Sequence, residues 1–288
     1  MTADLVALMW APFLMCLVLT GIHAYLGIHV IAREVVFVDI ALAQIAALGA
    51  AAASLVGIDA DHPLSYWFGL AATMAGALVL ALTRTRRRQV SQEAVIGVVY
   101  AVSAAAAILL VDRVPHGAEH LRSMLVGSIL TVRGPDVATV AGLYAAVGVF
   151  HWLCRRPFFL ISTDPATAFR DGRRVRWWDF LFYASFGLVV TSSVRVAGVL
   201  LVFSYLIVPA LAGIAVGGPI STRLMVGWAF GTGVSVLGML ASAFLDLPTG
   251  ATVACMFGLA LVLWSGVLRA RRVGQAAAAP SHIPSNRH

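Results

Sequence analysis

Apolar stretches separated by short polar segments follow one another along almost the whole chain. A helix needs about 20 apolar residues to cross the hydrocarbon core of a bilayer. Nine stretches approach or exceed that length: residues 6–31, 35–57, 64–82, 94–111, 136–153, 180–194, 196–216, 224–244 and 251–268. This pattern predicts an all-α, polytopic helical membrane protein with about nine transmembrane helices, or eight if the first stretch is miscounted.

Two further segments do not fit the pattern of a simple span. Residues 124–132 are apolar but too short to cross a bilayer, so we expect a re-entrant segment or a broken part of the next helix. Residues 273–288 are low in sequence complexity, with alanines followed by proline and serine, which predicts a disordered tail. Residues 1–272 are interpreted as a single transmembrane domain.

Charge orients the predicted helices. All 20 basic residues are arginines, and the net charge is +7. Their clusters at residues 84–88, 155–176 and 269–272 follow the ends of predicted spans, which indicates membrane orientation instead of nucleic-acid binding. The positive-inside rule places all three clusters in the cytoplasm, and an even number of crossings separates them. The N-terminus is then outside and the C-terminus inside.

A polar segment between two predicted spans, residues 164–172, has the start and stop signals of a short helix. Asp164 can cap its N-terminus, Pro165 suits the first helical position and Gly172 can end it. A polar helix is not stable in lipid, so this one must lie on a membrane face, where it can contact a soluble partner. The surrounding arginines place it on the cytoplasmic face.

Several stretches carry a resemblance to a known family: residues 37–49, 92–97, 125–130, 164–172 with 198–210, and 246–251. In this order and spacing they resemble the integral-membrane permeases of the zinc/manganese/iron family of ABC importers. Residues 164–172, for example, resemble the family's D-P-E-x-A-x-x-x-G. The resemblance implies a homodimeric, multi-pass permease of a bacterial inner membrane. It also implies two cytoplasmic ATP-binding subunits and an extracytoplasmic metal-binding protein.

In this resemblance the 164–172 helix is the coupling element that docks into the ATPase, through Asp164, Pro165, Ala168 and Gly172. The chain has no G-x-x-x-x-G-K-[ST] motif. ATP hydrolysis is therefore expected in the separate subunit, and the chain itself is not expected to be an enzyme.

The family's usual metal motif in the second helix, D-A-L-S-H, is altered here. Alignment on Gly49 puts Gln44 at the histidine position and Ile40 at the aspartate position. Asp39 lies one residue earlier, which rotates its side chain by about 100° around a helix. The usual site is therefore absent or rebuilt.

Polar and ionisable groups inside spans are costly and usually functional, which makes several residues candidates for a rebuilt metal pathway. The candidates are His23, His29, Asp39, Gln44, Glu119 and His120. We expect the Glu119–His120 pair at the outer mouth, His23 and Gln44 near mid-membrane, and Asp39 nearer the cytoplasm. Each has a structural alternative: a histidine can bond to a nearby carbonyl, Asp39 can pair with an arginine or a helix end, and loop charges are commonly solvated.

The favoured function is that of a permease subunit in an ATP-driven importer of a divalent transition metal. Imidazole and carboxylate ligands suit zinc, manganese and iron(II), and we favour zinc because several imidazoles are available. No permanently bound cofactor is expected. An ion-coupled secondary transporter is the alternative, although it would need deep carboxylates, for which Asp39 is the one candidate. An intramembrane metalloenzyme would need a ligand set such as H-E-x-x-H, which the chain lacks.

Overall fold

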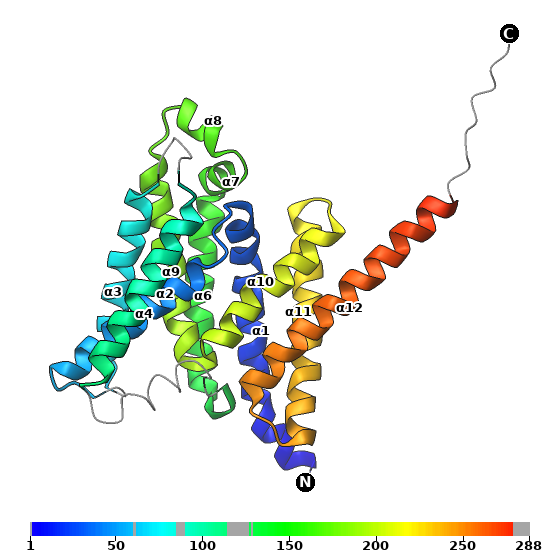
Figure 1. The fold of residues 1–288 in the computed structure, drawn as a ribbon. Helices are drawn as coiled ribbons and strands as arrows, with labels where there is room; N and C mark the ends of the chain where they lie inside the picture. The colour runs from blue at the N-terminus through cyan, green and yellow to red at the C-terminus, as the bar shows by residue number, and fades with distance from the viewer. Residues whose placement is uncertain (1, 60–61, 85–89, 114–126, 128, 279–288) are drawn as a thin grey trace.

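The computed structural model describes residues 2–59, 62–84, 90–113, 127 and 129–278 (Figure 1). Every regular element in those ranges is a helix. Nine of the described helices are long and apolar enough to cross a membrane. The prediction of an all-α protein with about nine spans is therefore confirmed.

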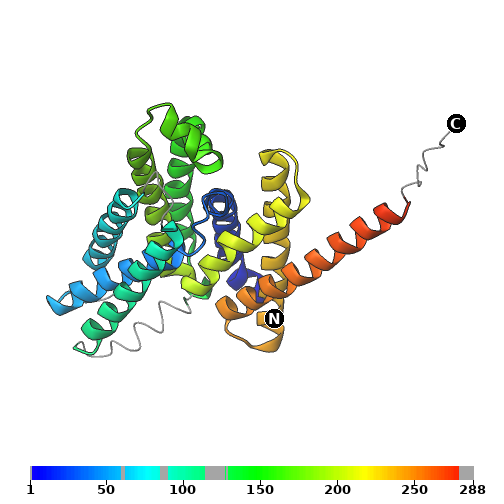
Figure 2. The ribbon, with the colours of Figure 1, turned by 45° about the horizontal axis from the view of Figure 1, so that its top comes forward.

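The helices differ in how far they are buried. The interior is formed by α1, α2, α9 and α10, whereas α4 and α12 contribute few buried residues and turn apolar side chains outward. Both views show α12 leaning away from the other helices (Figures 1 and 2). Outward apolar faces are expected where a protein meets lipid or another subunit. The elements are α1 (Thr2–Ala32), α2 (Val38–Leu55), α3 (Pro63–Leu82), α4 (Gln92–Val111), η1 (Ile129–Thr131), α6 (Gly134–Leu153), α7 (Arg155–Thr163), α8 (Pro165–Arg170), α9 (Val175–Ala197), α10 (Val199–Val216), α11 (Ile220–Leu245) and α12 (Thr249–Ala278).

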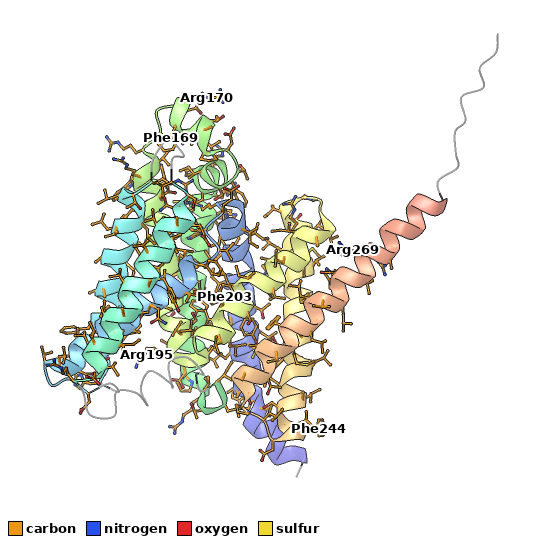
Figure 3. The ribbon with its side chains drawn as sticks, viewed as in Figure 1. Phe169, Arg170, Arg195, Phe203, Phe244 and Arg269 are labelled. Atoms are coloured by element: carbon orange, nitrogen blue, oxygen red, sulfur yellow. The ribbon has the colours of Figure 1, made fainter. Side chains whose placement is uncertain are left out.

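One end of the bundle carries α7, α8, the end of α3 and the start of α4, and we call it the arginine-rich end. Arg170 on α8 lies at this end, whereas Arg195 on α9 and Phe244 on α11 lie at the opposite end (Figure 3). The N-terminus is also at the opposite end, and α12 runs back toward the arginine-rich side. This arrangement agrees with the orientation predicted from the arginine clusters.

The predicted boundary between the sixth and seventh spans is wrong. The sequence predicts that the seventh span opens at residue 196, but residues 196 and 197 close α9, and α10 begins after Gly198. Gly198 has a φ of +78°, a conformation that glycine adopts without a steric penalty and that ends α9. The N-terminal end of α9 also differs, because the helix begins at Val175, five residues before the predicted start of the sixth span at residue 180.

Two helical segments lie outside the prediction. The nine-residue α7 opens with Arg155 and Arg156, so hydropathy alone gives no sign of it. Phe158 and Ile161 are nevertheless buried three residues apart, which is the spacing of one helix face. At the other end of the chain, α12 continues to Ala278, beyond the predicted start of the tail at residue 273.

Gly127, which belongs to the family-like stretch, lies against the α9–α10 junction. Gly127 has a φ of +68°, and a Cβ atom at this position would collide with the backbone of Ala197 and Gly198. A glycine is therefore required for this close approach. After Gly127, the described part of the predicted short stretch is the 3₁₀ turn η1 and Val132.

Two residues at the start of α4 hold neighbouring helix ends. The Gln92 side chain donates to the carbonyl of Leu80, near the end of α3, over 2.9 Å. The Glu93 carboxylate accepts from the backbone N–H of Phe37, just before α2, over 3.1 Å. Groups at helix ends lack intrahelical partners, so these side chains satisfy them and join α2, α3 and α4.

Candidate metal pathway and coupling site

His23 is fully buried on α1 and has one ring nitrogen facing a second helix. Its Nδ1 lies 2.9 Å from the carbonyl oxygen of Leu19, and since a carbonyl can only accept, Nδ1 carries the proton. Nε2 therefore holds a lone pair, 3.3 Å from the hydroxyl of Ser193 on α9, which shares its single proton between this nitrogen and the carbonyl of Val189 at 2.8 Å. Metal-binding histidines commonly have this arrangement, with one nitrogen fixed by a carbonyl and the other left as the ligand.

Asp39 lies in the first turn of α2 and is only 1% exposed. Neither carboxylate oxygen has a hydrogen-bond partner among the described residues. Burying an unpaired charge is costly, and buried polar groups are almost always satisfied. Asp39 is therefore a candidate ligand for a cation.

The described hydrogen bonds do not bring His23 and Gln44 together. Gln44 is half-buried on α2. Within the described part of the chain, His23 hydrogen-bonds only to Leu19 and Ser193, and its ring lies edge-on to Tyr144 of α6. No group of three or more potential ligands from His, Cys, Asp and Glu occurs among the described residues. Glu119 and His120 lie outside those residues.

His29 is enclosed near the arginine-rich end instead of facing an open path. Its Nδ1 lies 2.9 Å from the hydroxyl of Ser162 on α7. That hydroxyl donates its single proton to the carbonyl of Phe158, so it must accept from His29, whose Nδ1 carries the proton. Phe159 and Phe182 flank the imidazole ring. These contacts make His29 part of the joint between α1 and α7.

A buried ionic network, which sequence reasoning missed, lies beside His29. Arg33, directly after α1, donates to the Asp179 carboxylate of α9 and to the Ser162 hydroxyl. The other oxygen of Asp179 is 3.4 Å from Nε of Arg84, at the end of α3. All three charged side chains are at least nine-tenths shielded from solvent. An aspartate within a mostly apolar helix was a usable signal, because such residues rarely lie there without a role.

The predicted short helix is confirmed as α8, with both predicted ends. Asp164 accepts a hydrogen bond from the backbone N–H of Thr167 over 3.0 Å, and Gly172 has a φ of +67°. Hydrogen bonds from Thr167, through its side chain and its backbone, hold the pKa of Asp164 below its ordinary value. Ala168 is fully buried against Ile161 and Val175, so it supports α8 from inside. The exposed residues of α8 are Ala166 and Arg170.

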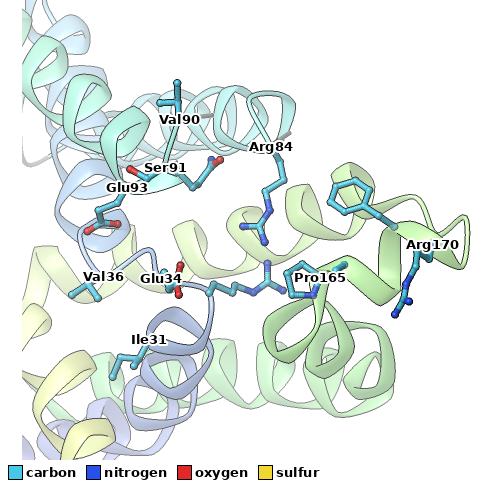
Figure 4. Close-up of a pocket in the computed structure, with 13 residues that line it drawn as sticks. Ile31, Glu34, Val36, Arg84, Val90, Ser91, Glu93, Pro165 and Arg170 are labelled. Carbon is cyan, nitrogen blue, oxygen red and sulfur yellow. The ribbon is translucent and has the colours of Figure 1, made fainter. Parts of the chain in front are cut away.

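A cavity of about 830 Å³ separates α8 from the neighbouring helix ends (Figure 4). Pro165 and Phe169 form one wall, and Arg33 and Glu34 of the turn between α1 and α2 contribute another. Arginines and glutamates both line the space, so the cavity has no single sign of charge. It leaves α8 without close packing on this side.

The sequence matches the profile of the ABC 3 transport family over residues 6–267. The chain belongs to the ABC 3 transport family. It is therefore a multi-pass membrane protein of a transport family.

Several relatives of this ABC 3 protein have names that refer to metal transport. It is 27% identical over 228 residues to a "Probable metal transport system membrane protein" of Thermotoga maritima, covering 78% of this chain and 77% of the relative. It is 25% identical over 190 residues to "Manganese transport system membrane protein MntC" of Listeria innocua, covering 65% and 64%. The match covers less than two thirds of the length of several relatives, the Listeria protein included.

A solved structure has the same fold as this ABC 3 chain. It is described as "PsaBC from Streptococcus pneumoniae in complex with Fab", and it matches with a TM-score of 0.74 and 18% identity. The match covers 92% of this chain and 95% of the other. This coverage shows that the arrangement of helices extends through both chains.

Proposed function

We propose that this chain is the permease subunit of an ATP-driven importer that moves a divalent transition metal across a membrane. The observation that carries the proposal is the buried carboxylate of Asp39, which has no hydrogen-bond partner among the described residues. The chain belongs to a transport family, and relatives have names that refer to metal transport. A passing cation would neutralise this charge while it is bound. A single carboxylate holds a cation loosely, and loose binding allows release.

The proposed route uses both deep residues and the outer pair. Glu119 and His120 collect the cation at the outer mouth, and His23 offers Nε2 at mid-membrane. Asp39 and Gln44 on α2 complete the path, and His29 keeps the end of α1 in place. Support for His23 comes from Nδ1, which the Leu19 carbonyl fixes, so that the lone pair is on Nε2.

Two cargo metals have separate support. Zinc is favoured by the imidazole of His23, since nitrogen ligands suit zinc. Manganese is supported by the names of relatives and by the carboxylate oxygens of Asp39, which suit a harder cation. The deciding experiment is uptake of zinc, manganese and iron(II), each in turn, by cells carrying the permease with its ATPase and its binding protein.

That experiment also tests the alternative of an ion-coupled secondary transporter. Uptake by the ATP-driven importer should disappear when the ATPase subunit is omitted. Uptake that persists without the ATPase and collapses with the ion gradient would support the secondary transporter. Absence of uptake for all three metals in the full system would reject metal import.

The proposed partners are a homodimer mate, an extracytoplasmic metal-binding protein and a cytoplasmic ATPase that docks on α8. Docking is supported by the exposed Ala166 and Arg170 at the arginine-rich end. Ala166→Glu should prevent co-purification of the ATPase, because a bulky charge is placed in the contact. Ala270→Glu on α12 changes an equally exposed alanine away from α8 and is the matched control. Equal co-purification of both variants would place the docking surface elsewhere.

A further inference from the structure

The end of α1 is held by a network of charged and polar groups that are almost fully buried. Arg33 is 4% exposed, and its Nε donates to the Ser162 hydroxyl over 2.8 Å. Its guanidinium also donates to Asp179 and lies 3.9 Å from the ring centroid of Phe182. One side chain thus joins α1 to α7 through Ser162 and to α9 through Asp179 and Phe182.

The network continues to a third helix end. Arg84, which follows α3, shares the Asp179 carboxylate at 3.4 Å. The carbonyl of Arg84 accepts a hydrogen bond from the side chain of Arg176, in the first turn of α9, over 3.3 Å. The ends of α1 and α3 are therefore both fixed to the first turns of α9, directly after the segment that contains α7 and α8.

Stability alone is a weak reason for this arrangement. Two arginines share one carboxylate, and Nη2 of Arg33 is buried without a hydrogen-bond partner among the described residues. Buried ion pairs seldom stabilise a fold more than packed apolar groups of the same volume would. Their better-attested use is to specify one geometry, because breaking one partner leaves an uncompensated charge.

The two sides of the α7–α8 segment are packed differently. Ser162 of α7 is tied to Arg33, whereas Pro165 and Phe169 of α8 face the cavity of about 830 Å³. A force on the exposed face of α8 can therefore displace α8 into the cavity. Because Ser162 on α7 is hydrogen-bonded to Arg33, the movement is transmitted through α7 to the end of α1. His23 of α1 lies ten residues before Arg33, about 15 Å away along the helix axis.

We propose that Arg33, Asp179 and Arg84 are positioning residues that connect α7 and α8 to α1 and α3, so that movement of α8 reaches the part of α1 that carries His23. The proposal rests on the proposed function for its consequence in transport. The structural part of the proposal, that the network holds α7 and α8 in place, does not depend on which metal is transported. None of the three side chains is assigned contact with the metal.

The test compares Asp179→Asn and Arg84→Gln with the parent chain. Arg195→Gln is the control, since it removes an arginine from α9 at the opposite end. Hydrogen–deuterium exchange of α7 and α8 is measured on the full chain in lipid nanodiscs. Zinc and manganese uptake per ATP hydrolysed is measured on vesicles that contain the permease and its ATPase, with the binding protein present. Arg84→Gln is the milder change and keeps the test decisive if Asp179→Asn does not fold.

We expect both network variants to exchange about tenfold faster in α7 and α8 than the parent and the control. Metal moved per ATP should fall by about tenfold, because ATP hydrolysis continues without reaching α1. Unchanged exchange would overturn the proposal, whatever the transport result. Faster exchange with unchanged metal per ATP would also overturn it, since the pairing would then be structural only. A parent complex that moves no metal would instead reject the proposed function, and the exchange comparison would still decide the network.

Discussion

The polar groups between α1 and α9 and the carboxylate of Asp39 on α2 are equally buried, but they differ in their partners. Along α1, His23 meets Ser193, and Arg33 meets Asp179 and Ser162. Asp39 meets no hydrogen-bond partner among the described residues. Groups that bond across helices hold those helices together, whereas a buried carboxylate with neither oxygen bonded is a place where a cation can bind. We call the bonded groups between α1, α7 and α9 the framework, and the comparison distinguishes it from Asp39, the candidate site for the transported metal.

The strongest test of this comparison is Asp39→Asn. Loss of the negative charge should lower metal uptake by at least about tenfold, as removal of a metal ligand or its support commonly does. The thermal midpoint should stay the same or rise, because a buried unpaired charge is removed. Asp246→Asn is the matched control, since Asp246 is exposed and asparagine also tolerates its positive φ of 53°. Normal uptake with a lowered midpoint would make Asp39 a framework residue.

The fold was predictable because its signals are local. Apolar length marks the spans, and arginines mark their orientation. The capping residues Asp164 and Gly172 mark α8, which the structure confirms. The boundary at Gly198 was missed because the charged Arg195 suggested a break three residues earlier, whereas α9 continues past this arginine to Ala197.

The framework was not predictable for a different reason. Arg33 and Asp179 are 146 residues apart in the chain, and His23 and Ser193 are 170 apart. Their pairing exists only after the helices have assembled. His151 makes the same point: it attracts no hypothesis from sequence, yet it is buried between Ser185 and Tyr25. A single sequence shows that such a residue is costly within a span, but not which partner compensates for it.

The second test compares substitutions of His23 and of Ser193, because a metal ligand and a structural hydrogen-bond pair predict different results. His23→Ala should reduce uptake by about tenfold if Nε2 is a ligand. Ser193→Ala removes the hydroxyl facing Nε2 and should leave uptake near the parental level, since the metal would displace that contact anyway. Uptake and the thermal midpoint are measured at matched expression. Equal losses of both quantities in the two variants would mean that the histidine and serine form a structural pair.

Ser162 tests the framework side of the comparison. Its hydroxyl accepts from Arg33 and His29 and is 3% exposed. Ser162→Ala should destabilise the protein by about 1–3 kcal/mol, because two buried donors lose their acceptor. Ser204→Ala is the control, since that half-buried hydroxyl donates to the carbonyl of Leu200 within its own helix. Thermal or denaturant unfolding in the same lipid measures the difference, and equal stability of the two variants would contradict a role for the network in holding α7.

The smallest effect is expected from the cap of α8, which lies outside the framework. The pKa of Asp164 is lowered from its ordinary value of 3.8 by its hydrogen bonds with Thr167, so the ionised carboxylate favours the folded helix. This contribution is fully present above pH 3.8 and is lost as the pH falls through the lower, folded-state pKa.

Asp164→Asn keeps a capping oxygen at every pH, and Asp164→Ala has none at any pH. Exchange of the Thr167 amide, corrected for the intrinsic effect of pH, measures the cap. We expect the parent to resemble the asparagine variant at neutral pH and to approach the alanine variant in acid. Since α8 packs loosely beside its cavity, a change confined to α8 and absent from α1 would show that the cap and the framework act independently.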